Sequence, residues 1–596
     1  MKKDTRTSRF PAAAGFIATI LAALGFILYC NRVWEMDLSV PFGYGGDCTL
    51  DSMIIKSIVE YGHKGLYFCY RMGAPGISEL IDTPFFDINL SAQIWVLSKF
   101  TKSYPLIFYL IYFMTYPSAA GAMYLLTGKV TERIPLRAVA GFIYAIAPYH
   151  FFRAMSHITL SNYFVVPIGI WLAMLIAEEP FKGLAPERFG KKGWWKTAVM
   201  YLSCILLGLS NIYYAFFALF CMGLALLYKC FSTGKIKGIW REAASLVVLL
   251  VSVLASLMPK ILYTSQNGAN EIAGIRAECS TEIYALKIIQ MILPPGFTAS
   301  PFLKKLIDHY NRAAFNVNEN AFSSLGAVAV AGFLLMCLWV IYRLSAPGRT
   351  KDSRRAKQLD HLSLTAVALL LYCMGGGFGA LISYFVTPEI RCLTRGSIVI
   401  SCLCLCVFVI TADHLLSIST KADKLRKGAV WTAVAGICCL SVYADTARSA
   451  PHWHDSMQQK NVVLTEFFGK VEDTMDDGDM IYQLPYMQFP EVPPIENMQD
   501  YQPAVGYLYT DTLRWSYGGM KGRSDPVLDL SQLPAGDELL NNIRDRGFAG
   551  VYIDTDGYAD KGAADIAYFR DTLGIEPIVA SDNTLYFFDI RNAEVK

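Results

Sequence analysis

The sequence predicts an α-helical polytopic membrane protein of about eleven transmembrane helices, followed by an α/β domain on the extracytoplasmic side. Hydrophobic residues make up 54% of the chain and charged residues only 17%. The apolar residues gather in stretches that approach or exceed the roughly 20 residues that cross a bilayer as helix. Because lipid leaves no partner for free backbone groups, such stretches must be helical.

The apolar stretches fill the first three quarters of the chain. Three of them are short, and one re-entrant hairpin is an alternative for the pair that flanks Ser210 and Asn211. The predicted spans are 11–30, 104–126, 137–150, 158–178, 197–209, 213–228, 242–262, 321–343, 362–386, 397–418 and 429–446.

Basic residues set the predicted orientation. Lys2, Lys3, Arg6 and Arg9 precede the first span, which places the N-terminus in the cytoplasm. No small-residue cleavage site follows that span, so it is expected to stay as an anchor. Counting alternately, every loop expected inside is basic, with Lys129, Arg133, Arg137, Arg188, Lys191, Lys192, Lys196, Lys229, Lys235, Lys237, Arg241, Arg349, Lys351, Arg354, Arg355, Lys357, Lys421, Lys424, Arg426 and Lys427.

An odd number of spans in a multi-pass cell-membrane protein places the C-terminal segment outside. The chain is expected to have two domains. Residues 1–446 form the membrane domain, with long outer loops at 31–103 and 263–320. Residues 447–596 form the extracytoplasmic domain. Its segments 479–486, 547–554 and 584–590 read as strands and 565–574 as a helix, a mixture that favours α/β.

Charge and cysteine usage narrow the partners. The net charge of +3 is spread over loops, which disfavours nucleic acid as a partner and leaves membrane lipid. Most of the fifteen cysteines lie within spans, where Cys behaves as a small apolar residue. A bridge between Cys48 and Cys69 is one alternative, which spacing alone does not decide.

The first outer loop contains a predicted helix. Leu50, Ile54 and Ile58 form one stripe after Asp47, which describes an amphipathic helix on the outer leaflet, ended by the Tyr61-Gly62 pair. Asp47 opens this helix after two glycines. It is therefore either an N-cap or a catalytic carboxylate that faces a cleft.

Other acidic residues lie close to the same membrane surface. Asp37 and Asp51 flank Asp47, and Glu79, Asp82 and Asp87 follow a rigid turn at residues 73–76. This second cluster is either a solvated loop or a binding site for a sugar or an acceptor.

Basic residues lie in two predicted outer turns. His150, Arg153 and His157 lie between helix ends, where they either anchor the chain at the interface or contact a phosphate. Arg391 and Arg395 are four residues apart and would share one face of a helix. They oppose the positive-inside trend, and paired guanidinium groups suit phosphate geometry, so phosphate binding is favoured over snorkelling.

The span interiors hold hardly any ionisable residue at mid-membrane, and the Gly375–Gly377 run is the one candidate helix break. Ion-coupled transporters usually need buried charges or broken helices there, so chemistry on the outer face is favoured over transport. In the C-terminal domain, Trp515 and Tyr517 lie among cations in 513–523, which fits an anionic glycan or lipid head group, or equally a structural turn.

The chain resembles the GT-C class of integral-membrane glycosyltransferases, and within it the YfhO-like bacterial membrane proteins. The resemblance covers roughly residues 1–450. It rests on GGDCTLDSMIIKSIVEYG with RMGAPG, on PYHFFRAMSH, on SNIYYAFF, on STEIYALKIIQMILP and on EIRCLTR.

The resemblance implies a polyprenyl-phosphate-linked sugar as donor and a glycan or lipid acceptor on the extracytoplasmic side. It implies a carboxylate of the first outer loop as base, which corresponds to Asp47. Asp51 is its nearest acidic neighbour, but no DxD motif occurs there, so no cofactor is assigned and use of a divalent metal stays open.

In this mechanism Asp47 takes the acceptor proton and Arg391 and Arg395 neutralise the departing lipid phosphate, with Arg153 and Lys287 as second phosphate candidates. Asp37, Glu79, Asp82, His150, His157, Trp515 and Tyr517 are the candidates for binding acceptor or sugar. Two alternatives remain, a lipid-linked-sugar flippase and a non-catalytic protein of glycan assembly.

Overall fold

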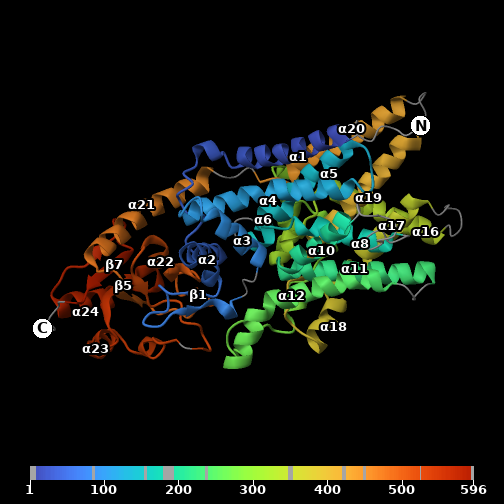
Figure 1. Ribbon diagram of the computed structural model, residues 1–596. Helices are drawn as coiled ribbons and strands as arrows, with labels where there is room; N and C mark the ends of the chain where they lie inside the picture. The colour runs from blue at the N-terminus through green and yellow to red at the C-terminus, as the bar shows by residue number, and fades with distance from the viewer. Residues whose placement is uncertain are drawn as a thin grey trace.

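The computed structural model describes residues 9–83, 87–153, 157–178, 194–234, 239–345, 353–418, 424–447, 451–523 and 525–591. They form a long helical bundle with a sheet-containing domain at one end, and the described chain starts at the opposite end (Figure 1). Several of the basic residues expected in the cytoplasm lie outside the described residues, namely Lys2, Lys3, Arg6, Arg188, Lys191, Lys192, Lys235, Lys237, Arg349, Lys351 and Lys421.

The bundle contains long and short apolar helices. Seven described helices, α1, α4, α11, α12, α16, α19 and α20, are long and apolar enough to cross a membrane. The bundle helices are α1 (Arg9–Cys30), α4 (Tyr104–Thr127), α5 (Ile134–Ala145), α8 (Val165–Ala177), α10 (Trp194–Gly208), α11 (Ile212–Thr233), α12 (Trp240–Asn267), α16 (Ala327–Ser345), α17 (Arg354–Cys373), α18 (Phe378–Phe385), α19 (Ser397–Ile418) and α20 (Lys424–Ala444).

Each of the eleven predicted spans coincides with a helix of the bundle, but α5, α8, α10 and α17 are shorter or more polar than the other seven. Helix α8 is buried almost throughout, against α11 and α4, so protein rather than lipid surrounds it. The number of helices that cross the membrane therefore stays a prediction.

Helix α19 lies at the centre of the bundle. Apart from residues near its C-terminal end, it is buried on all sides, with α5, α8, α16 and α17 around it. A helix that is apolar all round is expected to be buried in this way. The predicted span at 362–386 is interrupted at the candidate break: α17 ends at Cys373 and α18 begins at Phe378, and between them Gly376 has a φ of +67°, which favours glycine.

The helix predicted from residue 47 forms as α2 (Asp47–Tyr61), but its expected place on the lipid surface is wrong. Every residue from Cys48 to Ile58 is buried. α2 packs against α4 and against α22 (Val505–Tyr509) of the sheet domain, and the Lys56 ammonium donates to the carbonyl of Thr510 at 2.8 Å. A stripe of apolar residues does not distinguish a lipid surface from a protein surface. The thiols of Cys48 and Cys69 are both free.

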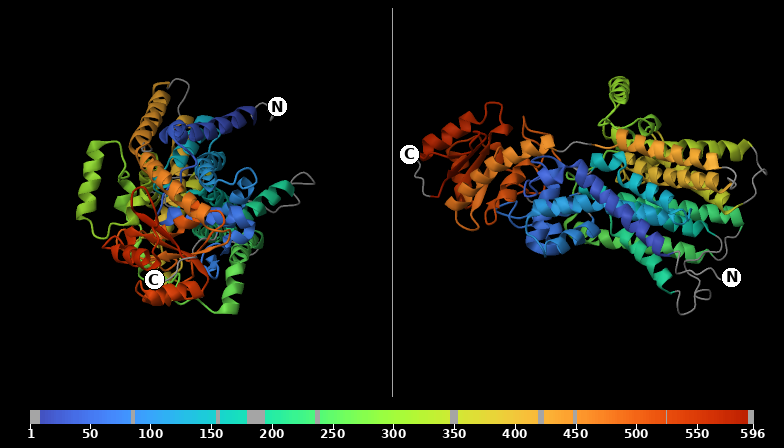
Figure 2. Two further views of the ribbon diagram at one scale, coloured as in Figure 1. Left: turned by 90° about the vertical axis from the view of Figure 1, so that its left-hand side faces the viewer. Right: turned by 90° about the horizontal axis from the view of Figure 1, so that it is seen from above.

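Shorter elements lie between the bundle helices. They are η1 (Val33–Glu35), η2 (Gly62–Leu66), β1 (Phe68–Cys69), β2 (Ser78–Glu79), η3 (Leu80–Asp82), α3 (Ile88–Leu97), α6 (Pro148–Arg153), α7 (Ile158–Ser161), α13 (Ser280–Ile283), α14 (Ile288–Ile292), α15 (Pro301–Ala313), η5 (Glu319–Ser323) and η6 (Leu393–Gly396). Helix α15 projects from the side of the molecule (Figure 2).

The C-terminal domain contains a five-stranded sheet in the order β4-β3-β5-β7-β6. Strand β3 runs parallel to β4 and β5, and β7 runs antiparallel to β5 and β6. The three predicted strands and the predicted helix are confirmed. The elements are α21 (Pro451–Thr474), β3 (Met480–Leu484), η7 (Gln502–Ala504), α22 (Val505–Tyr509), β4 (Arg514–Trp515), η8 (Leu530–Gln532), α23 (Asp537–Asp545), β5 (Phe548–Asp554), η9 (Thr555–Gly557), α24 (Ala563–Leu573), β6 (Ile578–Val579) and β7 (Leu585–Asp589).

Polar pairs join the sheet domain to the outer loops. Arg523 Nε lies 2.8 Å from Asp82 Oδ2, and both side chains are less than 10% exposed, at 9% and 5%. Arg276 donates from both Nη atoms to Glu491, at 2.8 and 3.0 Å. These contacts hold the domain over the end of the bundle where the polar cavity lies.

Candidate active site

A polar cavity of about 290 Å³ lies at the end of the bundle beside the sheet domain. Segments far apart in the sequence build it, including the start of α2, the turn before α7, the start of α11, α12 and the approach to α19. Acidic and basic side chains both line it. The lining residues are Asp47, Leu50, Asp51, Asp82, Asp87, His157, Thr159, Leu160, Asn211, Ile212, Tyr213, Leu257, Lys260, Gly274, Arg276, Glu319, Glu389, Arg391, Arg395 and Glu491.

Asp47 is the first residue of α2, and Gly46 is the N-cap. Its side chain is 45% exposed, and its Oδ2 lies 3.0 Å from Nδ1 of His157. Because the carboxylate faces the cavity rather than capping the helix, it is accessible to a ligand. The His157 imidazole contacts one oxygen of the Asp47 carboxylate, and the other oxygen is accessible from the cavity.

Asp51 lies one turn further along α2 and is buried. Its Oδ2 accepts from the backbone N–H of Ile158 at 3.2 Å. Burial, together with the negative charge of Asp47, raises the pKa of Asp51 well above its ordinary value. Of this carboxyl pair, Asp47 is the more exposed to the cavity.

Arg391 and Arg395 both line the cavity, but the expectation that they share one face of a helix is wrong. Arg395 lies in the short 3-10 turn η6, and Arg391 precedes that turn. The Arg395 guanidinium lies over the Tyr213 ring at 4.1 Å, and that of Arg391 lies 5.8 Å from the Tyr284 ring. The Nε of Arg395 is buried, and within the described residues it has no hydrogen-bond partner.

Arg153 is buried at 1% exposure and donates from Nη1 to Glu319 Oε2 at 2.6 Å. Burial tends to raise the pKa of Glu319, but the positive charges of Arg153 and Arg395 outweigh it and lower this pKa to about 2. Glu319 is thus an anion that holds the Arg153 side chain beside the cavity. Sequence reasoning missed Glu319, because only the length of its loop marked the region.

Asp82 and Asp87 line the cavity in different ways. Asp82 accepts from Arg523 and from the side-chain amide of Asn270 at 3.0 Å, so it also ties the sheet domain to the bundle. Asp87 accepts from the backbone N–H of Leu90 at 2.8 Å and caps α3. Burial raises the pKa of Asp87 to about 7.

Three predicted residues lie outside the cavity lining with partners of their own. Asp37 accepts from the Ser39 hydroxyl at 2.7 Å, which lowers its pKa. Glu79 accepts from the Tyr263 hydroxyl. The Lys287 ammonium donates to the backbone carbonyls of Phe315 and Asn316, the latter at 2.9 Å.

Three further predicted residues are buried away from the cavity. His150 stacks on the Tyr116 ring at 3.6 Å and lies 2.8 Å from the Thr115 hydroxyl. Trp515 is fully buried, and its indole N–H donates to Thr510 at 2.9 Å. The Tyr517 ring is buried as well. These three rings pack in the protein interior.

Besides Glu319, the cavity includes residues that no motif marked, namely Lys260, Arg276 and Glu491, and also Glu389, which lies in the EIRCLTR segment but was not singled out. Arg276 and Glu491 come from an outer loop and the sheet domain, and they meet only in the folded chain. In the part of the chain that the structure describes, no three His, Cys, Asp or Glu side chains form a group suited to a metal ion. His157 lies against one oxygen of Asp47, and the Ile158 amide donates to one oxygen of Asp51.

Comparison with known proteins identifies the fold. No curated protein matches the sequence significantly. Residues 93–389 match a family described as a domain of unknown function, DUF6311. The apo structure of ArnT from Cupriavidus metallidurans is similar over 97% of this chain and 98% of that chain, with 11% sequence identity and a TM-score of 0.53.

Two further solved structures match at lower TM-scores. ArnT from the same organism, bound to undecaprenyl phosphate, matches over 98% of this chain and 100% of that chain, with 11% identity and a TM-score of 0.49. AglB from Archaeoglobus fulgidus matches over 97% and 74%, with 13% identity and a TM-score of 0.46. On the similarity to apo ArnT, the chain has the fold of the GT-C integral-membrane glycosyltransferases.

Proposed function

We propose that this protein is a membrane glycosyltransferase that moves a sugar from a polyprenyl-phosphate donor to an extracytoplasmic glycan or lipid acceptor. One observation carries the proposal: a single cavity contains an accessible carboxylate paired with a histidine, together with Arg391 and Arg395. The carboxylate suits activation of a hydroxyl, and the arginines suit a phosphate.

In the proposed reaction an acceptor hydroxyl oxygen attacks the anomeric carbon of the donor sugar. The new bond forms as the bond from that carbon to the phosphate oxygen breaks, and the lipid phosphate leaves with the electron pair. Asp47 takes the hydroxyl proton. Arg391 and Arg395 stabilise the charge that develops on the departing phosphate.

His157 and Glu319 are positioning residues in this scheme. With its proton on Nδ1, the His157 ring donates to Asp47 and fixes one carboxylate oxygen. Glu319 pairs with Arg153, whose Nε and Nη2 have no hydrogen-bond partner within the described residues. Arg153 is therefore a second candidate cation for the phosphate, held beside the cavity by Glu319.

The fold comparison supports the donor class. ArnT, whose fold this chain shares, is known in complex with undecaprenyl phosphate. A lipid-linked phosphate is an anion that a planar guanidinium binds well, because it can donate two parallel hydrogen bonds.

The test is to incubate the purified protein with a panel of polyprenyl-phosphate sugars and candidate acceptors and to measure released lipid phosphate. We expect release with at least one donor and loss of release in Asp47→Asn. A flippase would move the donor across reconstituted vesicles without releasing phosphate. Transport of that kind, or donor binding alone, would reject the transferase.

The orientation is part of the proposal, because the cavity must face the extracytoplasmic side. Cys279 is exposed in the second outer loop. A membrane-impermeant maleimide should label it in intact cells, with Cys279→Ser as the control for site. A cysteine introduced at Lys424, at the start of α20, should react only after permeabilisation. The reverse pattern would invert the topology.

A further inference from the structure

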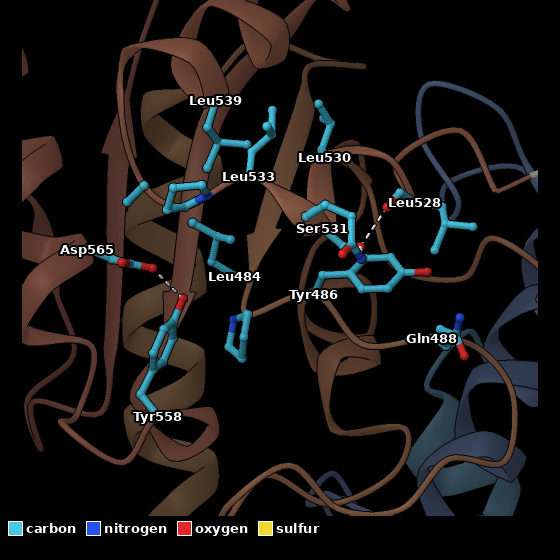
Figure 3. Close-up of a pocket in the computed structure, with 14 residues that line it drawn as sticks. Leu484, Tyr486, Gln488, Leu528, Leu530, Ser531, Leu533, Leu539, Tyr558 and Asp565 are labelled. Carbon is cyan, nitrogen blue, oxygen red and sulfur yellow. Dashed lines mark hydrogen bonds between the residues drawn. The ribbon is translucent and has the colours of Figure 1, made fainter.

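A second cleft, of about 440 Å³, lies in the sheet domain, and its fourteen lining residues share none with the polar cavity (Figure 3). Its position follows from the direction of the strands. Leu484 and Pro485 stand at the carboxyl end of β3, and Tyr558 follows the carboxyl end of the parallel strand β5.

The connections after these strands leave in opposite directions. The chain leads from β3 to β4 on one side of the sheet and from β5 toward β7 on the other. Such a reversal leaves a crevice outside the carboxyl ends of adjacent strands, which is the usual place for a ligand in sheets of this kind. The cleft is at that crevice.

The lining combines apolar and polar surfaces. Leu530, Leu533 and Leu539 lie together on one side of the cleft, and the rings of Tyr486 and Tyr558 lie on its other sides (Figure 3). The rings are fixed by carboxylates, since the Tyr558 hydroxyl donates to Asp565 at 2.7 Å and that of Tyr486 to Asp525 at 2.5 Å. Pockets of this size that mix apolar walls with a few placed polar groups are typical ligand sites.

The charge of the lining limits the ligand. No Lys, Arg or His is among these fourteen described residues, and Asp565 is the one carboxylate. An anion would find no cation there. Gln488 and Asp565 supply amide and carboxylate groups that can bind hydroxyls, and the tyrosine rings supply faces for C–H groups. A neutral sugar presents both kinds of surface.

The cleft and the polar cavity are joined by one stretch of chain. Arg523 binds Asp82, which lines the cavity, and two residues later Asp525 holds Tyr486 of the cleft. A chain of sugars bound in the cleft would thus be held on the domain that covers the cavity.

We propose that this cleft binds a neutral oligosaccharide segment of the acceptor. That the bound glycan is the acceptor rests on the proposed transferase function, but binding of the glycan to the cleft does not depend on transfer. The sheet domain would then supply affinity for a growing or extended glycan, and the cavity would supply the chemistry.

The experiment measures binding to the full-length protein in detergent, by saturation-transfer NMR and calorimetry. The probes are neutral oligomers of glucose, galactose, mannose or N-acetylglucosamine, with oligogalacturonate as the acidic comparison. We expect at least one neutral oligomer to bind and oligogalacturonate not to bind. Gln488→Ala and Asp565→Ala should each weaken binding about tenfold, since each removes hydrogen bonds to the ligand.

A matched pair elsewhere in the domain serves as the control. The Tyr568 hydroxyl donates to Asp537 at 2.7 Å, as Tyr558 does to Asp565, but neither residue lines the cleft. Asp537→Ala should leave binding unchanged. Because Gln488 is exposed, its variant tests the cleft even if Asp565→Ala fails to fold.

The two proposals fail in different ways. Absence of binding for every neutral oligomer, or binding that Gln488→Ala and Asp565→Ala leave unchanged, overturns the cleft even if lipid phosphate is released. Preference for oligogalacturonate overturns it as well. Neutral binding that both variants weaken, without any phosphate release, keeps the cleft and overturns the transferase.

Discussion

The Nδ1 atom of His157 lies 3.0 Å from Oδ2 of Asp47, although the two residues belong to separate outer segments of the chain. A carboxylate held in this way is fixed in direction while its other oxygen stays accessible. The pair lies in the same cavity as Arg391 and Arg395, so a base and a phosphate site would face one ligand.

Asp47→Asn should lower turnover about a hundredfold to ten-thousandfold, because it removes a general base but keeps the size of the side chain. Donor binding and membrane expression should stay near wild type. Released lipid phosphate measures turnover, and a donor-binding assay measures affinity. Glu35→Gln, an exposed acid of the same loop that pairs with Arg32, is the control. Full turnover in Asp47→Asn would remove this residue from the mechanism.

His157→Ala should lower kcat about tenfold or more with little change in KM, because it releases Asp47 without altering the cavity's cations. His157→Asn should recover part of the loss, since its amide N–H can occupy the place of Nδ1–H. Steady-state kinetics of both variants check this. Equal losses in Ala and Asn, or a loss only in KM, would indicate a role in packing or in donor binding instead.

Arg391→Lys and Arg395→Lys should each weaken donor binding or turnover about tenfold to a hundredfold, and Ala more so. Lysine keeps the charge but loses the planar fork, and at Arg395 it also loses the stacking on Tyr213. Donor titration of each variant measures the effect, with Arg570→Lys on the sheet-domain surface as the control. If both Lys variants and the double Ala variant behave as wild type, the arginines are interfacial anchors.

Breaking the pair between Asp82 and Arg523 should loosen the sheet domain. Both side chains are nearly buried, and removal of one partner of a buried pair costs about 3–5 kcal/mol. Asp82→Asn and Arg523→Gln should each lower the melting temperature and speed proteolysis of the C-terminal domain.

The double variant of this pair should lose less than the sum of the two single losses. The exposed pair of Arg570 and Asp571 is the comparison and should contribute about 0–1 kcal/mol. Strict additivity at Asp82 and Arg523 would mean that the two side chains act independently.

The sequence alone predicted the elements whose signal is local. The apolar runs produced the bundle helices, because a helix in lipid or in a protein core needs a continuous apolar stretch. The strands β3, β5 and β7 followed from short β-prone runs bounded by turns. Resemblance of several segments of the chain to GT-C enzymes anticipated the fold that the comparison with apo ArnT identifies.

The same local signals did not reveal what covers an element. The stripe of α2 predicted a lipid surface, but protein buries it. Trp515 looked available for stacking beside its cations, yet it is fully buried. Hydrophobic periodicity reports that a face is removed from water and does not report which partner removes it.

The composition of the candidate site was decided by the tertiary structure. Sequence reasoning named Asp47, Asp51, Arg391 and Arg395 among the cavity residues, because charges near a membrane surface are unusual enough to notice. It missed Glu319, Arg276 and Glu491, which no local pattern marks. Their meeting depends on contacts between segments hundreds of residues apart, and only the folded chain brings such groups within hydrogen-bond distance.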